Sequence, residues 1–67
     1  MTNIQRIRKE RGLSQSELSK LSDVPVRSIQ AYEIGTKNIN GCAALTVYKL
    51  AKALGVRSEE ILEITGN

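Results

Sequence analysis

Residues 14–35 of the chain read SQSELSKLSDVPVRSIQAYEIG. Ser14 and Glu17 have capping-box spacing, in which the serine caps a helix start and the glutamate returns a hydrogen bond to it. Asp23 suits a tight turn, because aspartate tolerates a left-handed backbone. Pro25 fits the first turn of a following helix, where its missing N–H has no helical partner. The stretch therefore predicts two short helices joined by a tight turn, the second over residues 26–33.

Helical periodicity continues on both sides of this stretch. We expect a first helix over residues 3–11, a fourth from an N-cap at Asn40 to Leu54, and a short fifth over residues 58–64. The residues expected to face inward are Ile4, Ile7, Leu18, Leu21, Ile29, Tyr32, Ala43, Val47, Leu50 and Leu54. Five helices without a strand predict an all-α fold, a compact five-helix bundle that forms one domain over residues 1–67.

Composition narrows the function. One cysteine and no histidine exclude an internal disulfide and argue against a zinc site or any other metal centre. We expect no enzyme, no cofactor and no small-molecule ligand, because no phosphate-binding loop or suggestive carboxylate pair is present. No apolar run approaches the roughly 18 residues of a membrane span. The lone thiol and the lack of a signal peptide predict a cytoplasmic protein. The net charge of +3 favours a polyanionic partner without proving one.

The helix expected at residues 26–33 presents two different faces. Ile29 and Tyr32 would pack inward, whereas the opposite face carries Arg27, Gln30, Ala31 and Ile34. Arginine donates two hydrogen bonds to guanine, and glutamine pairs with adenine. Val26 and Ala31 are suited to contact thymine methyl groups. The alternative is that Arg27 and Gln30 are ordinary solvated side chains. Their position directly after the turn favours contact with bases.

Motifs along most of the chain occur together in register. They are Ile4-x-x-Ile7-Arg8, Gly12-Leu13-Ser14-Gln15, Glu17-Leu18, Val24, Ile29, Glu33-x-Gly35 and the run from Leu50 to Val56. In these motifs the chain resembles the phage-repressor/Cro family, also called the xenobiotic-response-element (XRE) family of helix-turn-helix regulators. The resemblance implies a lambda-repressor-like DNA-binding domain. Its helix-turn-helix would span about residues 14–33, with residues 26–33 as the recognition helix in the major groove.

The resemblance also implies roles for particular residues. Those expected to read bases are Val26, Arg27, Gln30 and Ala31, and those expected to contact phosphates are Ser14, Gln15, Thr36, Lys37 and Asn38. Gln15 would also brace the recognition helix. Lys37 has the alternative of being a plain solvated lysine. Arg8 and Glu33 match an ion pair that ties the first helix to the recognition helix, although two exposed charges would be as common for arbitrary residues of these types.

The chain departs from the family pattern at three places. Asp23 stands where glycine is usual, and Pro25 replaces the usual serine or threonine cap. The segment from Gly35 to Leu50 is longer than the common spacing, with residues 38–41 in the extra room. The longer segment affects the assignment of phosphate contacts to Thr36, Lys37 and Asn38 more than the assignment of the recognition helix.

The expected function is a sequence-specific DNA-binding transcriptional regulator. We expect a repressor that acts by operator occlusion, because no second domain is evident. A homodimer would bind a pseudo-palindromic site in double-stranded DNA, its half-sites about 34 Å apart, and would be nucleoid-associated when bound. Its interface would lie on the C-terminal helix, where Ile61, Leu62 and Ile64 supply apolar side chains. The alternative is an antitoxin or protein-interaction module of the same fold that binds another regulator or a toxin.

Overall fold

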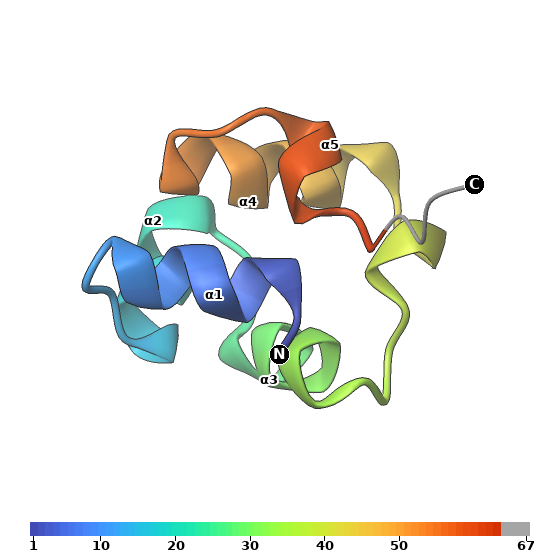
Figure 1. The fold of residues 1–67 in the computed structure, drawn as a ribbon, viewed down its shortest axis with the longest axis horizontal. Coiled ribbons are helices and arrows are strands. Elements are labelled where there is room, and N and C mark those ends of the chain that lie inside the picture. The colour runs from blue at the N-terminus through green and yellow to red at the C-terminus, as the bar shows by residue number, and fades with distance from the viewer. Residues whose placement is uncertain (64–67) are drawn as a thin grey trace.

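The computed structural model describes residues 1–63. Within this range the chain forms helices and one 3₁₀ turn without a strand, which confirms the all-α prediction. The elements are α1 (Asn3–Glu10), α2 (Gln15–Ser22), α3 (Val26–Ile34), η1 (Ile39–Gly41), α4 (Ala44–Leu54) and α5 (Ser58–Ile61). Figure 1 shows α4 and α5 at one side of the molecule and α3 at the other. α2 packs against both α3 and α4, and α1 contacts α3 and α5.

The helix ends follow the predicted signals closely at α1 and α2. Ser14 Oγ accepts the Glu17 N–H at 3.0 Å, and the Glu17 carboxylate accepts the Ser14 N–H at 2.8 Å, so the capping box is complete. α1 ends at Glu10, one residue before the predicted end, and Arg11 is its C-cap. The Arg11 Nε donates to the Leu54 carbonyl at 2.9 Å. That bond satisfies a carbonyl at the C-terminal end of α4.

The turn between α2 and α3 is held by two serines. Asp23 adopts the predicted left-handed conformation, with φ 59°. Ser19 Oγ donates to the Val24 carbonyl at 2.6 Å, and Ser22 Oγ donates to the Leu18 carbonyl at 2.7 Å. The prediction that Leu21 faces inward was wrong, because Ser22 is buried there and Leu21 is 61% exposed. A small residue at the inner position lets α2 approach its neighbours closely.

The start of α4 differs from the prediction. The helix begins at Ala44 rather than directly after Asn40, and Ala43 is exposed instead of inward. The Asn38 side chain caps η1 by accepting the Asn40 N–H at 2.9 Å. The Asn40 amide exchanges two hydrogen bonds with the Glu63 backbone, both 2.9 Å long. Asn40 therefore anchors the C-terminal segment and does not cap α4.

The core lies where the helices meet. Its buried members are Ile4, Ile7, Leu18, Val24, Ile29, Tyr32, Ile39, Val47, Leu50, Ala51, Leu54 and Ile61. α5 ends at Ile61, shorter than the predicted 58–64, because Leu62 is already extended and its carbonyl accepts the Asn3 amide at 2.8 Å. Ile64 lies outside the described residues. No helix in residues 1–63 has the length and apolar character needed to cross a membrane.

Candidate nucleic-acid interface

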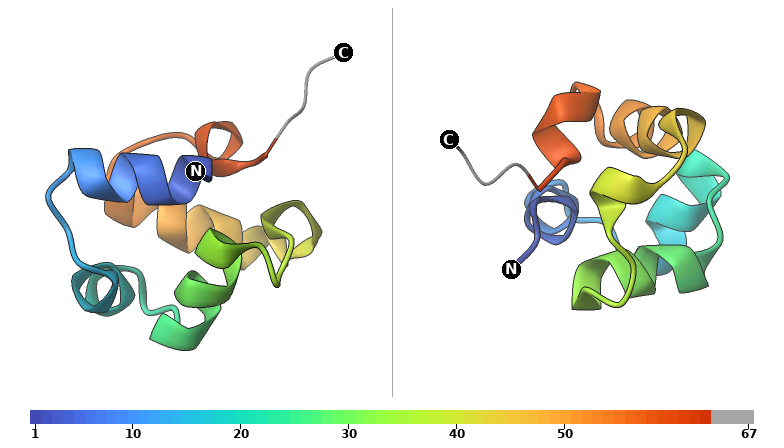
Figure 2. Two further views of the ribbon diagram at one scale, coloured as in Figure 1. Left: turned by 60° about the horizontal axis from the view of Figure 1, so that its bottom comes forward. Right: turned by 90° about the vertical axis from the view of Figure 1, so that its right-hand side faces the viewer.

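α3 lies next to α2 at the edge of the molecule (Figure 2), and its exposed residues are Arg27, Gln30 and Ile34. Ile29 and Tyr32 are buried on its inner side. Of the four residues predicted to read bases, Arg27 and Gln30 are exposed, and the smaller Val26 and Ala31 are partly buried. The short side chains leave room for close approach of a ligand to the helix backbone.

Gln15, the first residue of α2, contacts two side chains of α3. Its Nε2 donates to Glu33 Oε1 at 3.0 Å, and its Oε1 accepts from Gln30 Nε2 at 3.4 Å. Both ends of the Gln15 amide are therefore engaged, which fixes its orientation. The structure thus brings together one residue predicted to contact phosphate and one predicted to contact a base.

Arg8 and Glu33 form a buried, bidentate ion pair between α1 and α3. Arg8 Nε and Nη2 donate to the two Glu33 oxygens at 2.7 and 2.9 Å, and Nη1 donates to the Leu13 carbonyl at 2.8 Å. Burial raises the pKa of Glu33, but hydrogen bonds from Arg8 and Gln15 and nearby positive charge outweigh it and hold that pKa below its ordinary value. The hydrogen bond to Glu33 raises the Arg8 pKa. Both groups are charged, and the pair ties α1 to α3.

The start of α2 offers donors to an anion. Ser14 is exposed, and its Oγ already accepts the Glu17 N–H, so its hydroxyl hydrogen remains available as a donor. The N–H groups of Gln15 and Ser16, the first two helical residues, have no intrahelical acceptor and carry the positive end of the helix dipole. A phosphate placed here meets both kinds of donor.

The loop after α3 is held by internal hydrogen bonds. The Ala31 carbonyl accepts the N–H groups of Gly35 and Lys37 at 3.0 and 3.2 Å and the Thr36 hydroxyl at 3.4 Å. The N–H of Lys37 is therefore already used, whereas its side chain is exposed. Within residues 1–63 the N–H groups of Thr36 and Asn38 make no hydrogen bond. Thr36 and Asn38 are both exposed, and Asn38 precedes η1 as its N-cap.

Sequence reasoning missed two features of this surface. The bond between Gln15 and Gln30 joins residues of different helices, and no local pattern in the sequence signals it. Ser19 and Ser22, which hold the turn, lie three residues apart in a helix. Serine in a helix readily donates to the carbonyl four residues earlier, which could have identified Ser22, whereas the bond from Ser19 to the Val24 carbonyl follows no such pattern.

A bundle in which α2 and α3 meet at a tight turn, with Arg27 and Gln30 exposed on the second helix, defines a helix-turn-helix domain. Residues 4–61 match the family model described as "Helix-turn-helix". The chain is 34% identical over 64 residues to a Sinorhizobium fredii (strain NBRC 101917 / NGR234) protein named "Uncharacterized HTH-type transcriptional regulator y4dJ". That match covers 96% of this chain and 79% of the relative. No solved structure matches the chain.

The chain therefore belongs to the XRE-type helix-turn-helix family. This family is a DNA-binding class of transcription regulators and not a class of enzymes. The assignment confirms the resemblance found in the sequence.

Proposed function

We propose that the chain is a sequence-specific regulator that reads double-stranded DNA through α3. The observation that carries the proposal is the contact of Gln15 with Gln30 beside the exposed Arg27. This contact joins Gln15, which lies at a helix start where a phosphate can bind, to Gln30, whose amide can pair with the edge of a base. A helix on a protein surface has no general need for such a link.

The Gln30 amide retains the groups that adenine recognition requires. One of its two amide hydrogens goes to Gln15, which leaves the second hydrogen for adenine N7 and the oxygen for the adenine amino group. Arg27 would donate to O6 and N7 of a guanine, and Val26 and Ala31 would meet thymine methyl groups. Each bidentate pair discriminates against a wrong base by about 1–3 kcal/mol.

Phosphate contacts would set the register of α3 in the groove. Ser14 and the second amide hydrogen of Gln15 would bind one phosphate at the start of α2. The Lys37 side chain and the N–H groups of Thr36 and Asn38 would bind another. Such contacts position the protein without reading sequence.

We further propose a homodimer on a pseudo-palindromic operator, with half-sites about 34 Å apart. It would act in the cytoplasm and repress by occluding the operator. The burial of Ile61 removes one of the side chains expected at an interface on the C-terminal helix. Among the described residues expected at that interface, Leu62 is the one that is partly accessible. The proposal of a dimer depends mainly on the two-fold symmetry with which helix-turn-helix dimers bind paired half-sites.

The test is selection of bound sequences from a random DNA pool with the full chain, Arg27→Ala and the control Ser16→Ala. Ser16 is exposed beside Gln15 and is not among the proposed contacts. We expect a palindromic motif that loses information at one position per half-site in Arg27→Ala and is unchanged in Ser16→Ala. Binding with equal affinity for all sequences, or no enrichment, would contradict the proposal and favour the protein-interaction alternative.

A further inference from the structure

Three large apolar side chains lie in a groove between the end of α2 and the outer side of α4. Leu21 and Leu45 are each 61% exposed, and Tyr48 is 53% exposed. Together with Asp23, Lys49 and Lys52 they line a hollow of about 600 Å³, called here the α2–α4 groove. None of the residues proposed to touch DNA lines it. Grouped apolar exposure of this kind on a small domain is typical of an interaction surface.

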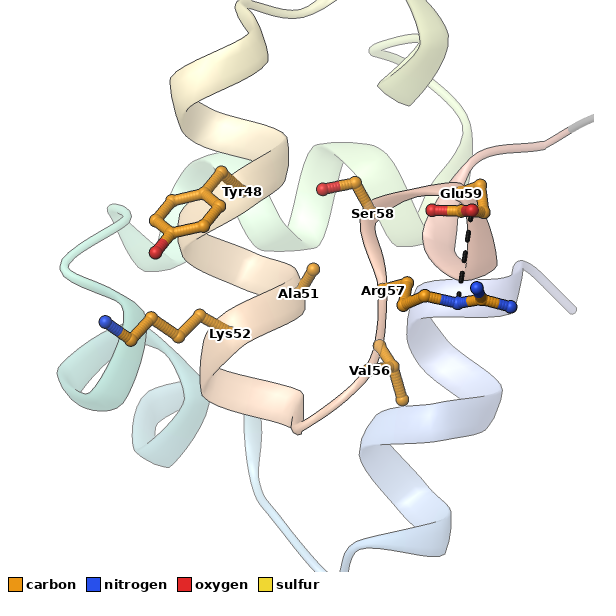
Figure 3. A pocket seen from close by; sticks show the side chains of 7 residues that line it. All are labelled: Tyr48, Ala51, Lys52, Val56, Arg57, Ser58 and Glu59. Carbon is orange, nitrogen blue, oxygen red and sulfur yellow. Dashed lines mark ion pairs between the residues drawn. The ribbon is translucent and has the colours of Figure 1, made fainter.

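The α4 side of this groove is basic. Tyr48 and Lys52 project from the same side of α4 (Figure 3), with the Lys52 ammonium 5.8 Å from the Tyr48 ring centroid. Within residues 1–63 no carboxylate lies within 4.0 Å of the Lys49 or Lys52 ammonium group. Asp23, at the α2 side, is the one acidic residue among those lining the groove. The groove therefore combines an apolar floor with two lysines along one side, neither of which forms an ion pair among the described residues.

We propose that the α2–α4 groove docks an acidic amphipathic segment of another protein. Its apolar side chains would enter between Leu21, Leu45 and Tyr48. Its carboxylates would lie over α4 and meet Lys49 and Lys52. A second copy of the chain fits less well, because a two-fold interface would bring the same lysine-bearing surface against itself. This inference goes beyond the proposed function and does not rest on it.

The experiment uses the full chain as bait for a displayed library of random 16-residue peptides. Selected peptides are then measured against wild type, Leu45→Glu, Lys52→Glu and the control Ala44→Glu. Ala44 is exposed beside Leu45 but outside the α2–α4 groove, so the control adds the same charge to the same helical turn. Circular dichroism verifies the fold of each variant, and sedimentation records its oligomeric state.

We expect enriched peptides to combine apolar residues with Asp or Glu. Leu45→Glu is expected to lower the affinity for these peptides about tenfold, as loss of a central apolar contact does. Lys52→Glu is expected to lower this affinity as well. Ala44→Glu is expected to bind within about twofold of wild type. If Leu45→Glu does not fold, the peptide affinity of Lys52→Glu alone tests the proposal. No enrichment, peptides without acidic residues, or unchanged binding by the groove variants would overturn the proposal.

Two further readouts separate this proposal from its neighbours. A wild-type dimer that dissociates in Leu45→Glu would overturn the proposal and show that a second copy occupies the groove. The DNA motif selected by Lys52→Glu is expected to equal that of wild type, because none of the residues proposed to touch DNA lines the groove. Failure of DNA recognition and failure of peptide binding are therefore distinguishable.

Discussion

Gln15 contacts α3 through a single amide that bonds to both Glu33 and Gln30. Gln15→Ala removes the group that orients Gln30, so we expect operator affinity to fall by about 1–2 kcal/mol. Discrimination at the base pair that Gln30 reads would fall with it. Because the two glutamines touch, their effects should not add, and a double-mutant cycle is expected to give a coupling of about 0.5–1 kcal/mol. Fluorescence anisotropy with the selected operator measures all four proteins.

The matched control for this cycle is Ser16→Ala, combined with Gln30→Ala. Ser16 is exposed, and its side chain makes no hydrogen bond to α3 among the described residues. Its coupling to Gln30 should be close to zero. Equal coupling in both cycles, or none in either, would show that Gln15 does not position Gln30.

The ion pair of Arg8 and Glu33 is buried, so loss of one partner leaves an uncompensated charge. We expect Arg8→Ala to lower the free energy of unfolding by about 3 kcal/mol, the lower end of the range for breaking buried pairs. The double variant Arg8→Met/Glu33→Leu removes both charges and should recover most of that loss. Urea denaturation measures both. Full stability of Arg8→Ala would show that the pair contributes nothing.

The pH dependence of stability follows from the depressed pKa of Glu33. Its folded-state pKa lies below the ordinary value of 4.5, so its contribution is fully present above about pH 4.5. The contribution is lost as the pH falls through the folded-state pKa. Glu33→Gln cannot titrate, so the stability gap between wild type and this variant should narrow as the pH falls from 7 to about 3. A gap that is constant with pH would contradict the assignment.

At the scale of the element, local signals predicted α2 and α3 well and α4 less well. The capping box of Ser14 and Glu17 is read from neighbouring residues, and the structure contains both of its bonds. The predicted start of α4 depended on Asn40 as its N-cap, but the Asn40 amide bonds to the Glu63 backbone instead. That partner is distant in sequence, so no cap rule could have found it. The prediction that Leu21 faces inward was wrong for a related reason. Which side of α2 is buried depends on how the helix packs against its neighbours, and Ser22 is the buried residue there.

Helix ends also yield a prediction about glycines. Gly55 ends α4 with φ +73°, and beyond its two chain neighbours no atom of the described residues lies within 4 Å of the position a Cβ would take. Gly55→Ala should therefore cost about 1 kcal/mol of stability from backbone strain alone. Gly41, equally open but without a positive φ, is the control. Gly41→Ala should be neutral or stabilising by up to about 1 kcal/mol. Equal thermal shifts in the two variants would contradict this explanation.

At the scale of the whole molecule, the sequence could predict which residues share a helix face but not which contacts join the helices. Periodicity alone placed Arg27 and Gln30 opposite Ile29 and Tyr32, and burial agrees. The link from Gln15 to Gln30 depends on how α2 and α3 cross. The availability of donors in the loop after α3 depends on which N–H groups the Ala31 carbonyl accepts. Both are properties of the assembled fold.

The number of copies on one operator is also a property of the whole molecule. The salt dependence of DNA binding by Lys37→Ala can measure it. A lysine that neutralises one phosphate contributes about 0.9 to the slope of log K against log salt concentration. Each copy brings one Lys37, so Lys37→Ala should reduce the magnitude of this negative slope by about 1.8 for a dimer and about 0.9 for a monomer. Anisotropy with the full operator from about 50 to 200 mM salt measures the slope.

Lys9→Ala provides the control for this measurement, because Lys9 is exposed on α1 and is not among the proposed DNA contacts. The slope of log K against log salt concentration for Lys9→Ala should equal that of wild type. An unchanged slope in Lys37→Ala would remove Lys37 from the phosphate contacts. A fall of about 0.9 on the palindrome would mean that one copy occupies the site. Only a fall of about 1.8, halved on a single half-site, agrees with two copies that each place Lys37 against a phosphate.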